Sequence, residues 1–360
     1  MRVGVLSYPM LYQRTGGLQI QINESIAGLR ELGVDVTLVD PSRVSLSQFD
    51  IIHVFAAING NHRIVETARS LGCKVVLSPL IRPSWTRFTG WRSAMIERLV
   101  GRLTNWHVHT IYQELKVALD ESHKIIALGV TEKESIQAAF DIPADKVCVI
   151  PNGIPQRFFD ATPDLFRERF AIDGPCILNV AAINPHKNQL ALVKATAGTG
   201  YTVMLFGECL KEHEDYLAAL TAYPHVRYGG RIAYQDPILP SAYAAATAFA
   251  LPSHDEVMPL SVMEALAAGT PVVMTDRHAM GMKPSSMVKE CGPDDVDALR
   301  RLLIDTVTAV RAPLACKEVV TQYRWRHVAE SILRVYEEVL PQGKGVKVVA
   351  EVGEMVGSVA

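Results

Sequence analysis

PSHDEVMPLSVMEALAAGTPVV, residues 252–273, has the strand–helix–strand order that is typical of a parallel α/β sheet. The apolar run 248–251 predicts a buried strand that stops where this stretch begins. A polar loop follows, and then a short helix with Pro259 near its first turn, where a missing N–H costs nothing. Gly269 ends the helix, and residues 271–274 predict the next buried strand.

The helix in this stretch carries one charge that needs a partner. From Pro259 to Ala268 the residues are apolar or small, except for Ser261 and Glu264. An isolated carboxylate is costly inside a protein, and no Lys or Arg lies within one helical turn of Glu264. Hydroxyl groups of a bound ligand would satisfy this carboxylate. A structural hydrogen bond to a neighbouring loop is the alternative.

The start of the same helix predicts an anion site. The N–H groups of its first turn, such as those of Leu260 and Ser261, have no acceptor within the helix and point to one place in space. Such a place favours phosphate. A carboxylate for sugar hydroxyls beside a helix N-terminus for phosphate indicates a nucleotide-sugar site.

The same residues form a long motif. Glu256 and Glu264 are separated by seven residues and followed by Ala-x-Ala-x-Gly-x-Pro-Val-Val. This motif resembles the signature of retaining glycosyltransferases of the GT-B fold, family four, and the resemblance covers roughly residues 2–340. It implies transfer of a sugar, with retention of anomeric configuration, from a nucleoside diphosphate sugar to an acceptor hydroxyl.

The resemblance also implies an α/β fold of two Rossmann-like domains that face each other across a cleft. We expect residues 1–160 to form the acceptor-binding domain and residues 161–323 to form the nucleotide-sugar domain, after an irregular linker that runs to about Gly174. Residues 324–340 are expected to be a helix that crosses back to the first domain, and residues 341–360 a loose tail.

Composition places the chain among soluble globular proteins. Apolar residues make up 49% and charged residues 21% of the 360, and the net charge of −2 implies no nucleic-acid partner. The six cysteines are far apart without a C-x-x-C, which argues against zinc and for a reducing compartment. The chain opens directly on a strand and has no apolar run of membrane-spanning length. We therefore expect a cytoplasmic protein, or one that is peripheral on the inner face of the plasma membrane.

The first residues predict a doubly wound domain. An apolar strand over 3–7 leads to a loop with Gly16 and Gly17, and then to a helix over 19–32. Glycines there would let the backbone approach a phosphate closely, although such a pair is more often only a tight turn. The resemblance implies that this loop faces the donor diphosphate, and that Gln19 contacts the acceptor.

Two residues that are usual in the family are missing. Many relatives carry a His after the fourth strand, where this chain reads Ser78-Pro79-Leu80. They also carry an Arg ahead of the loop lysine that corresponds to Lys187, where this chain has Ala182. Lys187 would then be a point charge for the diphosphate, and Arg231 is a candidate to replace the missing Arg.

The segment 82–106 is basic and aromatic. It holds five arginines against the single acid Glu97, and Trp85, Phe88 and Trp91 recur every three residues. This pattern is typical of a helix that lies on an anionic membrane. A core-facing helix with a solvated basic face is the alternative.

Two further patterns concern helix starts. Thr131 with Glu134 three residues later predicts a capping box. Asp295-Val296-Asp297 has the D-x-D form of some metal sites, but it follows Pro293 at a predicted helix start, where Asp residues cap. We therefore expect no metal and no cofactor apart from the donor, which would be linked to UDP or GDP.

The site residues follow from the motif and the resemblance. Glu264 would hold ribose hydroxyls, Lys187 and the N–H groups near Leu260 the diphosphate, and Glu256 the donor sugar or the positive charge developing on it. The catalytic residues would be Glu256 and Lys187, and the acceptor-binding residues Gln19 and Arg82. The donor-binding residues would be Gly16, Gly17, Lys187, Gly207, Arg231, Glu256, Met258, Leu260, Ser261 and Glu264.

The family and the basic segment together suggest a lipid-linked or oligosaccharide acceptor, in bacterial cell-surface polysaccharide or glycolipid synthesis. Two other functions remain open. A nonhydrolysing sugar-nucleotide epimerase shares the fold but needs an acid/base pair at the anomeric centre, which the sequence does not offer. A non-catalytic sugar-nucleotide-binding subunit is favoured by the missing Arg and His and disfavoured by the two glutamates and Lys187.

Overall fold

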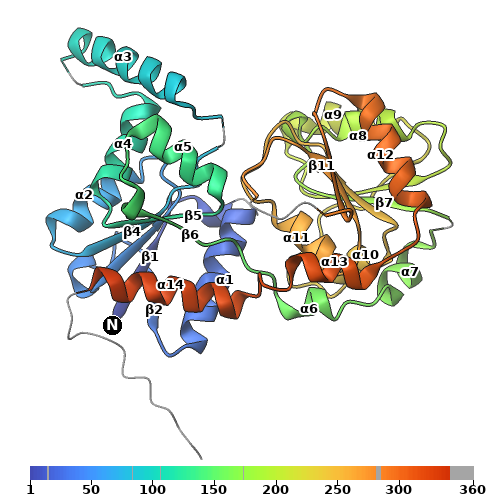
Figure 1. The fold of residues 1–360 in the computed structure, drawn as a ribbon, viewed down its shortest axis with the longest axis horizontal. Coiled ribbons are helices and arrows are strands. Elements are labelled where there is room, and N and C mark those ends of the chain that lie inside the picture. Colours follow the sequence, from blue (N-terminus) through green and yellow to red (C-terminus); the bar gives the residue numbers. More distant parts are fainter. Residues whose placement is uncertain (14–15, 83, 106, 173, 281–284, 341–360) are drawn as a thin grey trace, which may run out of the picture.

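The computed structural model describes residues 1–13, 16–82, 84–105, 107–172, 174–280 and 285–340. It has two lobes, each built on a six-stranded parallel sheet with helices on its faces (Figure 1). The predicted fold class is therefore confirmed. The expected tail 341–360 lies outside the described residues. Within the described ranges, every helix is too short or too polar to cross a lipid bilayer.

The first sheet has the strand order β2-β1-β3-β4-β5-β6. Its strands are almost continuously apolar because helices cover both of their faces. The strands are β1 (Arg2–Leu6), β2 (Asp35–Leu38), β3 (Ile51–Phe55), β4 (Lys74–Ser78), β5 (Lys124–Ala127) and β6 (Val147–Val149). The helices of this lobe are α1 (Gly17–Glu31), α2 (His62–Ser70), α3 (Arg87–Leu103), α4 (Ile111–Glu121) and α5 (Val130–Phe140).

The second sheet has the strand order β12-β11-β10-β7-β8-β9. Its strands are β7 (Cys176–Val180), β8 (Thr202–Phe206), β9 (Val226–Tyr228), β10 (Ala248–Leu251), β11 (Val272–Thr275) and β12 (Val288–Cys291). Its helices are α8 (Gln189–Thr196), α9 (Glu214–Thr221), α10 (Ile238–Ala245), α11 (Leu260–Ala267), α12 (Val296–Thr308) and α13 (Pro313–Val320).

The topology brings three loops to one place. In each parallel sheet the crevice for ligands lies outside the carboxyl ends of the strands. The loop after β1 leads to Gly16, the loop after β7 to Lys187, and the loop after β10 to Glu256. All three loops border the space between the lobes.

Three local predictions were wrong. The linker is not irregular, because it forms α6 (Gln156–Phe159) and α7 (Asp164–Phe170), whose phenylalanines enter the core of the second lobe. The capping box does not form, since α5 begins at Val130 without a side-chain cap. Helix α1 begins at Gly17 instead of residue 19, because Gly16 takes the extended conformation of an N-cap residue.

The last helix, α14 (Trp325–Val339), returns to the first lobe and packs along α1 (Figure 1). The close approach depends on small residues: a Cβ on Gly28 would lie 3.0 Å from Cβ of Ala329. Trp325 begins α14 directly over Gly153, where an added Cβ would lie 2.4 Å from the indole. The crossing helix therefore has the position that the resemblance implied.

Tyr336 of α14 also reaches into the first sheet. Its hydroxyl lies 2.7 Å from Nδ1 of His53 on β3, and Nε2 of His53 lies 2.9 Å from the Ser78 hydroxyl. Burial without a charged partner lowers the pKa of His53 to about 3, so the ring is neutral. His53 is therefore a core residue with both ring nitrogens paired.

We expect the Gly153→Ala variant to lose stability. The added methyl group must displace Trp325, and overpacking of this kind typically costs about 1–3 kcal/mol. The midpoint of urea unfolding measures the loss. The matched control is Gly292→Ala, where the nearest atom to an added Cβ lies 4.0 Å away. Equal midpoints for the two variants would show that Trp325 does not anchor the crossing helix.

Candidate functional site

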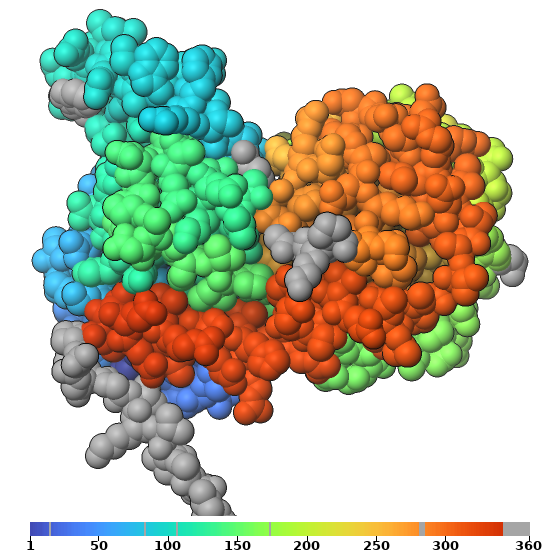
Figure 2. All heavy atoms as spheres, in the orientation of Figure 1, coloured from blue at the N-terminus to red at the C-terminus, as the bar shows by residue number. Residues whose placement is uncertain are grey.

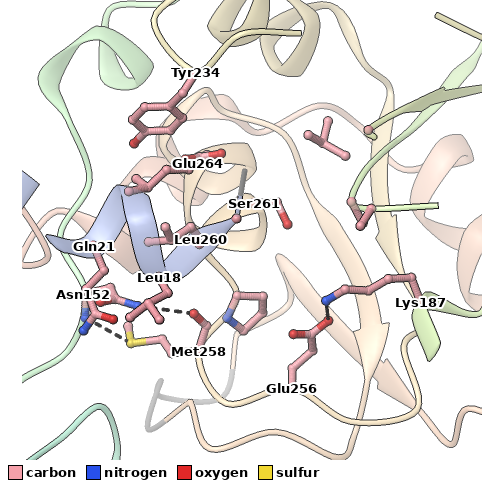
Figure 3. Close-up of a pocket in the computed structure, with 18 of the residues that line it drawn as sticks. Leu18, Gln21, Asn152, Lys187, Tyr234, Glu256, Met258, Leu260, Ser261 and Glu264 are labelled. Atoms are coloured by element: carbon pink, nitrogen blue, oxygen red, sulfur yellow. Dashed lines mark hydrogen bonds and ion pairs between the residues drawn. The ribbon is translucent and has the colours of Figure 1, made fainter. Parts of the chain in front are cut away.

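A cavity of about 420 Å³ lies between the two lobes, and residues of both line it (Figure 3). The first lobe contributes the Gly16–Gly17 turn and the first turns of α1. The second lobe contributes the loops after β7, β8 and β10 and the start of α11. All ten predicted donor-binding residues are in this lining, although they come from segments spread over more than two hundred residues of sequence.

Glu264 lies on α11 and is only 4% exposed. Its Oε2 accepts a hydrogen bond of 2.8 Å from the Tyr243 hydroxyl on α10. The other oxygen, Oε1, is buried without a hydrogen-bond partner among the described residues. Tyr243 is therefore a structural hydrogen-bond partner of the kind given as the alternative in the sequence analysis, and it satisfies one carboxylate oxygen. The other oxygen can accept a hydrogen bond from a ligand in the cavity.

Burial raises the pKa of Glu264 to about 7, against the opposing effects of the Tyr243 hydrogen bond and the positive charge of Arg157. The Tyr234 hydroxyl is close enough to favour the ionised carboxylate, but it makes no hydrogen bond of ordinary geometry to it. Arg157 lies over the Tyr234 ring, 4.4 Å from its centroid. At neutral pH the Glu264 carboxyl group is therefore close to the midpoint of its titration.

Lys187 and Glu256 form an ion pair on another wall of the cavity (Figure 3). Nζ of Lys187 lies 2.6 Å from Oε1 of Glu256. Asn184 caps the short 3-10 helix Pro185–Lys187 by accepting a hydrogen bond from the Lys187 N–H, which fixes the start of the lysine side chain. The pair is partly exposed, so its charges remain accessible to a ligand.

Glycines allow the walls of the cavity to approach each other closely. A Cβ on Gly17 of the first lobe would lie 3.8 Å from the Leu260 side chain of the second lobe, so the two helix N-termini approach each other here. Gly207 has φ of 155° and an added Cβ would lie 1.8 Å from the Ala181 carbonyl oxygen. Only glycine fits at that position.

The position of the missing arginine opens onto the same cavity. Ala182 and Arg231 both line it, and both are exposed. Arg231 forms no ion pair with a carboxylate of the described residues. Arg231 and Lys187 are therefore two positively charged residues of the same lining.

Sequence reasoning missed several residues of the lining. Asn152 joins the lobes, because its N–H lies 3.2 Å from Met258 Sδ and its Nδ2 lies 3.4 Å from the Met258 carbonyl oxygen. The Pro-Asn-Gly sequence around it indicated only a turn. Tyr234 and Tyr243 carried no sequence signal, since aromatic residues in apolar stretches normally belong to the core.

The two predicted acceptor residues lie outside the lining. Gln19 is half-buried on α1, and its neighbours Leu18, Ile20 and Gln21 line the cavity instead. Arg82 is 60% exposed and lies 3.7 Å from Asp255, the residue before Glu256. Arg82 is therefore at the edge of the site, where the first lobe meets the loop after β10.

The D-x-D sequence acts as a cap. Oδ1 of Asp295 accepts a hydrogen bond of 2.8 Å from the Ala298 N–H at the start of α12. The position after Pro293 predicted this capping role.

Comparisons with known proteins agree with this arrangement. Residues 162–283 match the model of the family described as glycosyl transferases group 1. The phosphatidyl-myo-inositol mannosyltransferase of Mycobacterium leprae is 32% identical over 316 residues, which cover 83% of this chain and 76% of that protein. The glycogen synthase of Mycobacterium tuberculosis is 27% identical over 267 residues, which cover 69% of this chain but only 60% of the synthase.

Solved structures share the fold. A crystal structure of HepE from Anabaena in complex with UDP has a TM-score of 0.70 at 17% identity, and the match covers 94% of this chain and 100% of HepE. Sucrose-phosphate synthase from Thermosynechococcus elongatus has a TM-score of 0.71 at 16% identity, over 94% and 99% of the two chains. From the identity and coverage of the mannosyltransferase match, together with the family model, this chain belongs to the glycosyl transferases group 1 family.

Proposed function

We propose that this chain is a glycosyltransferase that moves a sugar from a nucleoside diphosphate sugar to an acceptor hydroxyl with retention of anomeric configuration. The observation that carries the proposal is Oε1 of Glu264, which is buried beside the cavity, one turn after the start of α11, and has no hydrogen-bond partner among the described residues. A pair of ribose hydroxyls would donate to this oxygen. A diphosphate would then reach the helix N-terminus and Lys187.

The donor diphosphate is proposed to lie between Gly17 and Leu260. The N–H groups at the starts of α1 and α11 have no acceptors within their helices and favour an anion. Lys187 and Arg231 would add two positive charges, so the diphosphate would be held without a metal ion. Because HepE was solved with UDP and with UDP-glucose, UDP is the first nucleotide to test, with GDP as the alternative.

The transfer would break the bond between the anomeric carbon and the diphosphate oxygen. The acceptor oxygen would bond to the same face of the anomeric carbon, and its proton would pass to the leaving phosphate. Lys187 would stabilise the leaving diphosphate, and Glu256 the positive charge that develops on the sugar. The 2.6 Å ion pair supports this division of roles, because it places both charges on one wall of the cavity.

The acceptor is proposed to be a lipid-linked or oligosaccharide glycan, in the synthesis of bacterial cell-surface polysaccharide or glycolipid. Relatives named phosphatidyl-myo-inositol mannosyltransferase and O-antigen chain mannosyltransferase B support that direction. A thermal-shift screen with UDP, GDP and ADP identifies the nucleotide. Donor turnover with and without glycan acceptors then separates a transferase from an epimerase and from a binding subunit.

The Glu264→Ala variant should bind UDP about 1.5–3 kcal/mol more weakly, since it loses charge-assisted hydrogen bonds to the ribose. Calorimetry measures the loss. Glu132 is the matched control because it is an equally buried carboxyl group, with a pKa raised to about 7 by burial, on the other lobe and outside the lining. UDP affinity that changes equally in the Glu132→Gln variant would remove Glu264 from the ribose site.

UDP affinity should fall by about tenfold from pH 8 to pH 6. Ribose hydroxyls donate to the ionised carboxylate, and Glu264, with a pKa of about 7, is largely protonated at pH 6. Protonation of UDP itself would change the UDP affinity of the Glu264→Gln variant in the same way. The difference between the two pH curves therefore reports Glu264, and parallel curves would show that its ionisation does not matter to binding.

The Glu256→Gln variant should lose most of its turnover and little of its UDP affinity. Its charge matters mainly when positive charge develops on the sugar, so the loss falls on the transition state. Donor hydrolysis and UDP calorimetry measure the two quantities. Asp255→Asn removes the neighbouring carboxylate of the same loop and is the control. Full turnover by the Glu256 variant would exclude a catalytic role.

A further inference from the structure

Helix α3 stands at the outer end of the first lobe, remote from α14 and from the second lobe (Figure 1). It contacts α4 and α5 and extends beyond them. In the space-filling view its atoms form a projecting ridge (Figure 2). None of its residues lines the cavity, so its exposed surface needs an explanation of its own.

The outer face of α3 is apolar. Its large exposed side chains recur at intervals of three and four residues, which places them on one side of a helix. They are Phe88 (66% exposed), Trp91 (61%), Met95 (48%), Leu99 (60%) and Leu103 (76%), and Ile96 (47%) is a further exposed apolar residue of the helix. Soluble monomers rarely expose so many large apolar residues together.

Four arginines border this apolar face. At about 100° of rotation per residue, Arg87, Arg98 and Arg102 follow one edge of the stripe, and Arg92 lies on the other side. All four are exposed, and none forms an ion pair with a carboxylate in the part of the chain that the structure describes. The outer surface of α3 therefore carries four uncompensated positive charges.

The single acidic residue of α3 points inward. Glu97 is 4% exposed, its Oε2 accepts a hydrogen bond of 2.8 Å from the Thr110 N–H, and its Oε1 lies 3.2 Å from Nδ1 of His109. Burial alone would raise the pKa of Glu97, but the hydrogen bonds from Thr110 and His109 outweigh burial and lower it. The negative charge is thus held on the face opposite the arginines.

The orientation of α3 is fixed by close packing. A Cβ on Gly90 would lie 2.2 Å from the Ala139 carbonyl oxygen at the end of α5, so only glycine lets the helix approach so closely. Gly90, Glu97 and Gly101 form the buried face. Because this face is packed against α5, the helix cannot rotate to bury its apolar side.

We propose that the exposed face of α3 docks this chain onto an anionic lipid bilayer. The apolar stripe would enter the boundary between headgroups and acyl chains, and the flanking arginines would contact anionic headgroups. A second copy of the chain fits less well, because two faces that each carry four positive charges repel. The arginines around the apolar stripe favour an anionic lipid surface over an apolar protein partner.

The loop before α3 would connect the docked helix to the edge of the cavity. The loop before α3 carries Arg82, which lies 3.7 Å from Asp255 at the edge of the cavity. A lipid-linked acceptor could then reach the cavity without leaving the bilayer. That last step rests on the proposed function, whereas docking itself does not.

Sedimentation of the full chain with vesicles tests the proposal. We expect binding to vesicles of phosphatidylcholine and phosphatidylglycerol, little binding to phosphatidylcholine alone, and release as salt shortens the screening length from about 10 Å at 0.1 M to about 3 Å at 1 M. Arg87→Gln, Arg92→Gln and Arg98→Gln combined should weaken binding by about 100-fold. Arg167→Gln, Lys211→Gln and Arg301→Gln combined, which remove three exposed charges of the second lobe, should not.

A second variant tests the apolar stripe. Phe88→Ser with Trp91→Ser should also weaken vesicle binding, while UDP affinity and the melting temperature stay at the wild-type values. Equal loss in the two triple variants would overturn the proposal, because any three positive charges would then serve. A dimer in sedimentation velocity that the Phe88/Trp91 variant abolishes, without vesicle binding by the wild type, would overturn it in favour of an interface between copies.

Discussion

Desolvation of the Glu264 carboxylate is the constraint on which the candidate site depends. A carboxylate buried on α11 against α10 can be tolerated only if its oxygens find donors. Tyr243 supplies one donor, and the cavity leaves room for the others. In the proposed function, the ribose hydroxyls of the donor would supply the hydrogen bonds that burial of this carboxylate requires.

The second constraint is the meeting of the two lobes. Gly17 faces Leu260, and Asn152 contacts Met258, so the first lobe touches the very loop and helix that carry Glu256 and Glu264. A site built in this way is complete only while the lobes are together. In the proposed function, movement between the lobes would admit the donor and release the product, as is common where a ligand lies between two domains.

Sequence reasoning predicted the fold class, and the residues that it assigned to donor binding all line the cavity between the lobes. Most of them follow the end of a strand or lie in the first turn of a helix, where the sequence pattern is informative. Lys187, Gly207 and Glu256 are examples. It did not find the residues whose role depends on contacts with distant parts of the chain. Tyr243 and Asn152 act through partners more than twenty residues away. The predicted capping box of Thr131 does not form. The next residue, Glu132, accepts hydrogen bonds from the Ile81 and Leu128 N–H groups.

The path of α14 has a consequence for synthesis of the chain. Trp325, Val328 and Tyr336 belong to the same core as Val3 and Ile22 at the beginning of the chain. Synthesis must therefore pass the whole second lobe before α14 can pack against α1. The second lobe, whose core draws on residues from Leu128 to Val320, can be packed earlier. The core of the first lobe is thus completed only after the second lobe has been synthesised, because α14 supplies part of that core.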